Sequence, residues 1–311
     1  MKIIKDLTYK EYAKMEGLSN SMLSKIAISP LHFKESLETP QKQTEALTFG
    51  SLLHCLVLEP NNFERDFAME PLGINKRTNE GKEILAQFYL ENENKIIVTE
   101  EQVELAHLLK NKIMEHKIAK KLLTGKGDTE VSLFWADKET GVICKGRPDK
   151  ICNKIIVDLK TTRSAKPEEF IKHAYEFNYH KQAYWYSWGY EECFKEPPKG
   201  FVFVAVEKEP PYAVCVYEAT ELFKKVGEIE ARENLLTYKE CVDKGKWWGY
   251  DGEKEVIHSL EPPQWVLNKY LENLDLEDNK NDFFPDFPSE LEELQKETIK
   301  KLRGDKQWII N

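Results

Sequence analysis

The segment Gly146–Lys160 constrains this chain more than any other, because it puts charged residues at the ends of two neighbouring extended stretches. Asp149 follows Gly-Arg-Pro, and Asp158 and Lys160 close the apolar run that starts at Ile155. Alternate residues of a strand point to the same face of a sheet, so the side chains of Asp158 and Lys160 project together. If Asp149 ends the neighbouring strand, two carboxylates and one ammonium group meet at one point.

Such a cluster suits the hydrolysis of phosphodiesters with a divalent metal ion. Carboxylates hold a hard cation, and a lysine can orient a water molecule or contact the scissile phosphate. Asp158 also lies near a buried end of the predicted sheet, where an isolated carboxylate is costly without a metal ion or another partner. The simpler alternative is that Asp149 caps a turn while Asp158 and Lys160 form an ion pair on an edge strand.

Four further elements flank this segment in a fixed order along the chain. They are the opening Leu18–Leu23 with Ser29–Lys34, the helical phrase Leu47–His54, the acidic residue Glu130 in Thr-Glu-Val-Ser-Leu-Phe-Trp, and Gln182–Tyr186. Together the five elements resemble the PD-(D/E)xK nucleases, and in particular the RecE-type recombination exonucleases of phages. The likeness spans roughly residues 8–215. Five elements in one order are a far more specific signal than a single D-x-K triplet.

The resemblance implies a metal site. Its ligands would be His54, Asp149, Asp158 and the backbone carbonyl of Leu159, and the ion would be Mg²⁺. Imidazole is an unusual ligand for magnesium and suits manganese, so Mn²⁺ is also plausible. Without the resemblance, a single histidine such as His54 on a mostly apolar helix face is more often a hydrogen-bonded core residue than a ligand.

The resemblance also implies catalytic groups and DNA contacts. Glu130 would assist a second ion or position the nucleophile, and Lys160 would prepare the attacking water and stabilise the charge of the transition state. The residues expected to contact DNA are Gln182, Tyr186, Arg147 and Thr161. Gln182 and Tyr186 are one helical turn apart and share a face, although the aromatic residues around them are also typical of a helix packed in the core.

The charge of the chain bears on DNA binding. The 311 residues carry a net charge of −9, and affinity for a phosphate backbone comes largely from Lys and Arg. The excess acid is concentrated in residues 271–292, while residues 1–200 are close to balance. A local basic path over the first 200 residues therefore stays compatible with a nuclease that holds DNA in a channel.

Other patterns exclude several classes of protein. No apolar run reaches the length of about 18 residues that a membrane span needs, and the first residues lack the apolar region of a signal peptide, so we expect a cytoplasmic protein. The six cysteines are scattered without a C-x-x-C pair, which argues against disulfides and an iron–sulfur cluster. No nucleotide-binding loop, G-x-S-x-G elbow or H-E-x-x-H pair is present.

The resemblance implies an α/β fold with a restriction-endonuclease-like core, a central mixed β-sheet flanked by helices, and helical additions at both ends. We expect one nuclease domain over 1–311, made of a mainly helical part (1–128) that carries His54, a catalytic core (129–220) and a helical, loop-rich part (221–311). Strands are predicted at 130–135, 142–147, 155–160, 201–207 and 212–218. Helices are predicted at 8–16, from Ser19 to the Ser29-Pro30 break, and at 44–58, 100–123, 167–173, 179–194, 221–244 and 289–302, with loops or short helices over 61–95.

The sequence thus predicts a metal-dependent exodeoxyribonuclease that trims double-stranded DNA ends. By resemblance, it would degrade the 5′ strand, form a homo-oligomer and hand its product to a single-strand annealing protein. Two alternatives stay open. One is a structure-specific or restriction-like endonuclease on the same core, which would also cut closed circles. The other is a module without catalysis that binds DNA ends or a protein, although such a module has no need for both aspartates and the lysine.

Overall fold

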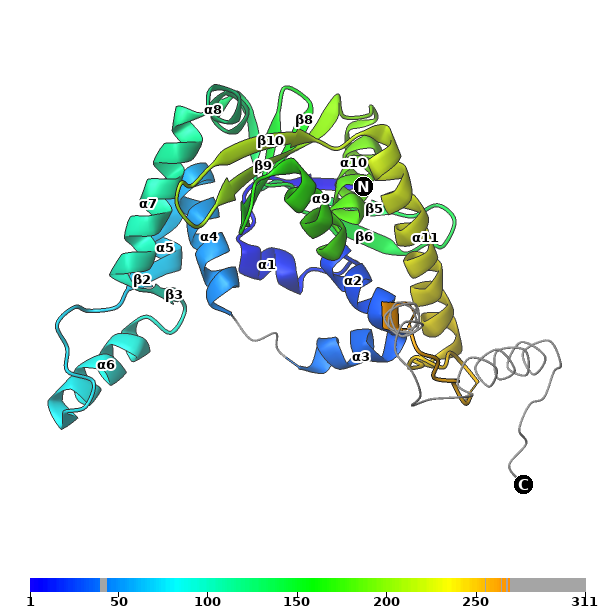
Figure 1. Cartoon of the computed structure of the whole chain (residues 1–311), viewed down its shortest axis with the longest axis horizontal. Helices are drawn as coiled ribbons and strands as arrows, with labels where there is room; N and C mark the ends of the chain where they lie inside the picture. Colours follow the sequence, from blue (N-terminus) through cyan, green and yellow to red (C-terminus); the bar gives the residue numbers. More distant parts are fainter. Residues whose placement is uncertain (40–43, 255, 264, 267, 269–311) are drawn as a thin grey trace, which may run out of the picture. The chain divides into compact units, whose positions relative to one another are not determined.

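The computed structural model describes residues 1–39, 44–254, 256–263, 265, 266 and 268, and Met1–Lys254 form one compact unit (Figure 1). Residues from 255 onward belong to a second unit. The predicted helix over 289–302 and the acidic segment 271–292 lie outside the described residues. Within the described ranges, no helix is long and apolar enough to cross a lipid bilayer. The six cysteines are free thiols.

The centre of the unit is a five-stranded mixed sheet in the order β10-β9-β8-β7-β4. Its middle strand β8 (Ile155–Thr162) runs parallel to β9 (Gly200–Glu207) and antiparallel to β7 (Lys150–Cys152). The edges are β10 (Val214–Glu218) and β4 (Gly127–Thr129). The prediction of a central mixed sheet flanked by helices is therefore confirmed.

Two of the predicted strands belong to a second, antiparallel sheet. β5 (Ser132–Ala136) and β6 (Ile143–Gly146) pair with each other, and β1 (Lys2–Ile4) pairs with β5. The predicted strand over 130–135 starts two residues later than expected. Glu130 takes a left-handed φ of 50°, so the chain turns there and leaves the central sheet.

Alternate residues of the central strands face two separate hydrophobic cores. Ile156 and Phe203 point into one core, whereas Val157, Leu159 and Val204 point into the other. Helices α10 (Tyr179–Phe194) and α11 (Glu221–Lys244) contribute to the first core, and α4 (Glu45–Leu58) and α7 (Glu100–Glu115) to the second. Because side chains alternate along β8, Asp158 and Lys160 lie on the face that α10 covers.

The remaining elements are short. They are α1 (Tyr9–Lys14), α2 (Asn20–Ile28), α3 (Pro30–Glu38), a 3₁₀ turn (Pro60–Asn62), α5 (Phe63–Asp66), β2 (Phe67–Met69), α6 (Asn79–Glu91), β3 (Ile96–Val98), α8 (Lys117–Thr124) and α9 (Pro167–Glu176). The predicted helices near 8–16, 44–58, 179–194 and 221–244 agree with α1, α4, α10 and α11. Figure 1 shows α6 away from the central sheet, beyond β2 and β3.

Three helices differ from the prediction for local reasons. The predicted break at Ser29-Pro30 does end α2, but a further helix that was not predicted, α3, begins at Pro30, because proline is tolerated at the first helical position and the Ser29 hydroxyl accepts from His32 N–H. The predicted helix 100–123 is two helices, because His116 has an extended backbone and its Nδ1 caps α8. The region 61–95 contains the 13-residue α6, capped by Thr78.

Candidate active site

A β-hairpin places the two aspartates side by side. The turn Asn153–Lys154 joins β7 to β8 with left-handed φ values of 51° and 69°, as a two-residue hairpin turn requires. In this register Lys150 lies opposite Val157, so Asp149 and Asp158 come next on the two strands. Asp149 thus lies beside Asp158, but it does so by preceding β7 and not by ending the predicted strand over 142–147, which pairs with β5 in the second sheet.

His54 reaches this hairpin from α4. Its Nε2 lies 2.8 Å from the carbonyl oxygen of Leu159, and its Nδ1 lies 3.5 Å from Asp149 Oδ2. A bond to a carbonyl oxygen requires the proton on Nε2, so in the neutral ring the lone pair of Nδ1 faces a carboxylate oxygen. Asp149 Oδ2 also accepts a hydrogen bond of 2.7 Å from the backbone N–H of Leu159.

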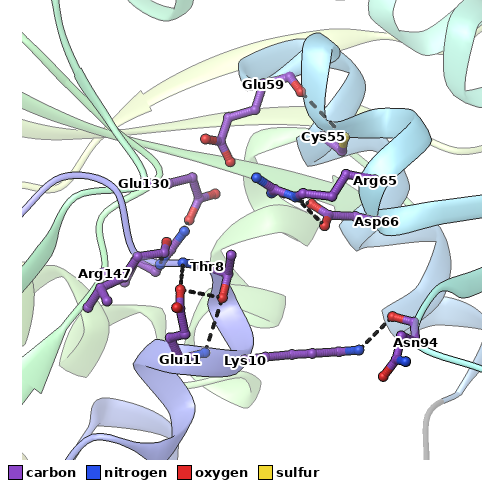
Figure 2. A network of polar contacts seen from close by, with 11 residues as sticks. Thr8, Lys10, Glu11, Cys55, Glu59, Arg65, Asp66, Asn94, Glu130 and Arg147 are labelled. Carbon is purple, nitrogen blue, oxygen red and sulfur yellow. Dashed lines mark hydrogen bonds and ion pairs between the residues drawn. The ribbon is translucent and has the colours of Figure 1, made fainter.

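Glu130 completes a group of three donors. Its N–H donates to the carbonyl oxygen of Asp149 at 2.9 Å, and its Oε2 accepts from Arg147 Nε at 2.7 Å (Figure 2). One ligand atom each of His54, Glu130 and Asp149 lie within 4.8 Å of one another. Burial raises the pKa of Glu130 to about 7, and the charge of Asp149 acts in the same direction while Arg147 opposes it. Burial, then the charge of Asp158, also raises the pKa of Asp149.

Asp158 and Lys160 form what we call the candidate catalytic pair. Asp158 is fully buried, and its Oδ1 accepts from Gln182 Nε2 at 2.7 Å. Its Oδ2 lies 2.7 Å from Lys160 Nζ and forms an ion pair with it. The ammonium group also lies 4.5 Å from the centre of the Tyr179 ring. Burial lowers the pKa of Lys160, but Asp158, Tyr179 and Asp149 together outweigh burial and raise this pKa overall.

Residues 19–259 match a family described as a PDDEXK-like domain of unknown function (DUF3799). The chain belongs to this PDDEXK-like family. It thereby joins the PD-(D/E)xK nucleases, as the order of its sequence motifs predicts. No curated protein sequence matches the chain.

At least one solved structure resembles this PDDEXK-like chain in fold. A crystal structure of a Eubacterium rectale protein, provisionally named an exonuclease, aligns over 84% of this chain and 98% of its own with a TM-score of 0.56 and 15% sequence identity. A structure of the protein SSO0001 covers 70% of this chain and 84% of its own at 19% identity, with a TM-score of 0.28, too low to argue a shared topology.

The donor set of this PDDEXK-like site fits a hard divalent cation. An imidazole nitrogen and two carboxylates gather at the end of the hairpin, and the carboxylate of Asp158 lies on the neighbouring strand. Oxygen and nitrogen donors without a thiolate suit Mg²⁺ or Mn²⁺. Of the predicted ligands, the structure joins His54, Asp149 and the carbonyl of Leu159 directly, whereas Asp158 contacts Lys160 and Gln182.

The predicted DNA contacts lie in different surroundings. Gln182 touches Asp158, and Tyr186 packs against Gly146 from the same helix. Thr161 is half-buried on β8. Arg147 is nearly buried and binds Glu130, so its guanidinium holds the site together; a phosphate contact by Arg147 stays a prediction.

Three neighbours of the site were not predicted from the sequence. The carbonyl of Leu7 and the hydroxyl of Ser132 accept from Arg147, at 2.7 Å and 3.4 Å. Figure 2 shows Arg65, which pairs with Asp66, extending from α5 toward Glu130. An arginine in a four-residue helix carries no sequence signal, so only the fold brings Arg65 toward Glu130.

Proposed function

We propose that this PDDEXK-like protein is a divalent-metal-dependent exodeoxyribonuclease acting on the ends of double-stranded DNA. The observation that carries the proposal is the meeting of three metal donors with the candidate catalytic pair at one end of the β7–β8 hairpin. A buried lysine beside a buried aspartate, next to an imidazole and two further carboxylates, is the combination that metal-assisted phosphodiester hydrolysis needs.

Each residue has a chemical task in this proposal. A bound Mg²⁺ or Mn²⁺, held by His54, Glu130 and Asp149 with the Leu159 carbonyl and Asp158 beside them, would supply a Lewis acid for phosphate and water. Glu130 and Asp149 would hold the ion in their ionised form, so metal binding would compete with the protonation that their raised pKa values favour.

The candidate catalytic pair has the second task. The ammonium group of Lys160 orients the attacking water and neutralises the negative charge that develops on the phosphate oxygens. Asp158 keeps Lys160 charged and in place, and Gln182 fixes Asp158 through its Oδ1. Arg147 fixes Glu130 in the same way on the other side of the hairpin.

The choice of DNA ends and the direction of digestion rest on resemblance. The order of motifs is that of the RecE-type exonucleases, and the E. rectale protein of similar fold is also named an exonuclease. We extend the proposal to 5′-to-3′ digestion in a phage-type recombination system, a homo-oligomer, a single-strand annealing partner, a cytoplasmic location and one nuclease domain over 1–311.

The test compares matched linear and covalently closed duplexes with Mg²⁺, Mn²⁺ or EDTA. The intact protein should degrade only the linear DNA and only with metal, whereas the Lys160→Ala and Asp158→Asn variants should not. Lys199→Ala, a lysine away from the site, serves as the matched control. Cutting of closed circles would favour the endonuclease instead, and no cleavage with either metal would refute the proposal. A label on the 5′ or 3′ end reports the direction.

A further inference from the structure

Four exposed lysines lie along α8 and the start of β4. Lys117, Lys120 and Lys121 belong to α8, and Lys126 immediately precedes β4. Among the residues that the structure describes, none of the four has an ion-pair partner, whereas nearby Lys112 pairs with Glu115. We call these four residues the lysine ridge.

The ridge differs from the other lysine-rich helix of the chain. In α11, Lys224 pairs with Glu221, and Lys239 pairs with Asp243. Residues three or four positions apart are neighbours on a helix surface, so an acidic residue at that spacing neutralises a lysine. No acidic residue stands at that spacing from any lysine of α8. The positive charge of the ridge is therefore left uncompensated within its own helix.

This arrangement works against the stability of α8. Lys117 is three and four positions from Lys120 and Lys121, so like charges repel each other on one face. Lys117 is also the first residue of the helix, where the positive end of the helix dipole disfavours a cation. The opposite face is satisfied, because Ala119 and Leu123 are buried in the core. The stability of α8 therefore gives no reason for three lysines on one face, whereas an anion bound to them would offset their mutual repulsion.

Lys126, the end of the ridge, is four residues from Glu130 along the edge strand. The chain runs from Lys126 through β4 to Glu130, whose N–H donates to Asp149. Extended residues advance about 3.3 Å each, so the four steps span about 13 Å. One strand of B-DNA rises about 3.4 Å per nucleotide, so about four nucleotides cover the same length. Figure 1 shows α8 on the outside of the unit, where a duplex can approach it.

We propose that the lysine ridge binds the phosphate backbone of duplex DNA whose end lies in the catalytic site. The identity of the polyanion rests on the proposed function. A chain with a net charge of −9 repels DNA as a whole, so binding depends on places where cations gather without acidic partners. The ridge is such a place, and it contacts the backbone without reading its sequence.

The test measures the affinity for a fluorescein-labelled duplex of about 30 base pairs by anisotropy in EDTA, from about 50 to about 300 mM KCl. In the ridge variant, Lys117, Lys120 and Lys121 are each replaced by glutamine. It should bind about tenfold or more weakly at low salt, and the slope of log K against log [KCl] should be shallower by about 3. The matched control replaces Lys224, Lys225 and Lys239 on α11 by glutamine and should change neither quantity. The proposal would be overturned if the slope of log K against log [KCl] were the same for the ridge variant and the control variant. It would also be overturned if the lysine ridge bound an acidic protein and not DNA.

A cleavage assay separates failure of the ridge from failure of the proposed function. With Mg²⁺, the ridge variant should cleave a hairpin with a stem of about four base pairs at the rate of the intact protein, because such a stem spans only the length up to Lys126 and ends before the three α8 lysines that the variant replaces. If the intact protein cleaves no DNA, the proposed function is refuted. The anisotropy measurement still tests whether the lysine ridge binds DNA. If it cleaves DNA but the slopes agree, only the ridge fails.

Discussion

The Nε2 atom of His54 lies 2.8 Å from the carbonyl oxygen of Leu159, although 105 positions separate the two residues in the chain. The N–H of Leu159 at the same time donates to Asp149 Oδ2 at 2.7 Å. The carbonyl of Leu159 thus contacts His54, and its N–H contacts Asp149, so one residue joins two predicted metal ligands. The helical N-terminal part is therefore tied to the catalytic strand by a direct polar contact.

Replacement of His54 by glutamine should weaken Mn²⁺ binding by about 10- to 100-fold, because it removes an imidazole donor and the contact that orients Leu159. The free energy of unfolding should fall by only about 1 kcal/mol, the worth of one hydrogen bond. Isothermal titration with Mn²⁺ measures the first effect. His107→Gln, on the exposed side of α7, is the matched control. Unchanged Mn²⁺ affinity in the His54 variant would remove His54 from the metal site.

Replacement of Lys160 by methionine should lower kcat by about 100- to 1,000-fold, because the transition state loses its cation. The change also leaves the carboxylate of Asp158 buried without a cation, at a cost of about 3 kcal/mol in the free energy of unfolding. Addition of Asp158→Asn removes that buried charge. The double variant should regain much of the stability in urea unfolding but none of the activity. Activity that returns together with stability would show that Lys160 acts only in folding.

Glu230 of α11 holds the first turn of α10, because its Oε2 lies 3.0 Å from His180 Nε2 and 3.3 Å from Lys181 Nζ, two buried groups. Gln182, the next residue, contacts the candidate catalytic pair. Glu230→Ala should therefore lower kcat about tenfold by misplacing Gln182, with little change in KM. It should also lower the free energy of unfolding by about 1 kcal/mol, a modest value because Glu230 is partly exposed. Glu233→Ala, on the exposed side of the helix, should change neither.

The carboxylate of Asp137 should make the free energy of unfolding depend on pH in the acidic range. Burial raises its pKa, but hydrogen bonds from Arg232 and Thr140 outweigh burial and hold the pKa below its usual value. A depressed pKa contributes stability that is present above the ordinary carboxyl pKa and is lost as the pH falls through the folded value. Asp137→Asn should thus be about 2 kcal/mol less stable at pH near 7, and the difference should shrink below about pH 4. Urea unfolding at several pH values measures it; a constant difference would contradict the assignment.

The sequence predicts the helices α10 and α11 to the residue, and for α11 local signals mark both ends. Thr220 caps α11, and Gly245 closes it in the left-handed conformation. The split at His116 is harder to predict, since the apolar spacing continues across it. The second sheet could not be predicted, because a strand pattern does not tell which partner a strand pairs with.

The candidate site was predictable to a similar degree. The spacing of Asp149, Asp158 and Lys160 is enough to bring them together, since it depends only on one hairpin. The ion pair of Glu130 with Arg147 and the approach of Arg65 depend on a left-handed residue and on contacts between distant segments. Both contacts arise from the packing of distant segments, so no local sequence pattern predicts them.

The length of the two-residue turn Asn153–Lys154 sets the register of β8 against β7, and with it the positions of the site residues on β8. Because alternate residues of β8 face different cores, one inserted residue that shifts β8 by one place would swap its faces, so that Val157 would take the place of Asp158 under α10. The site would then lose both the side chain of Asp158 under α10 and the carbonyl of Leu159 that faces His54. Members of the family can therefore vary in the residues of this turn far more freely than in their number.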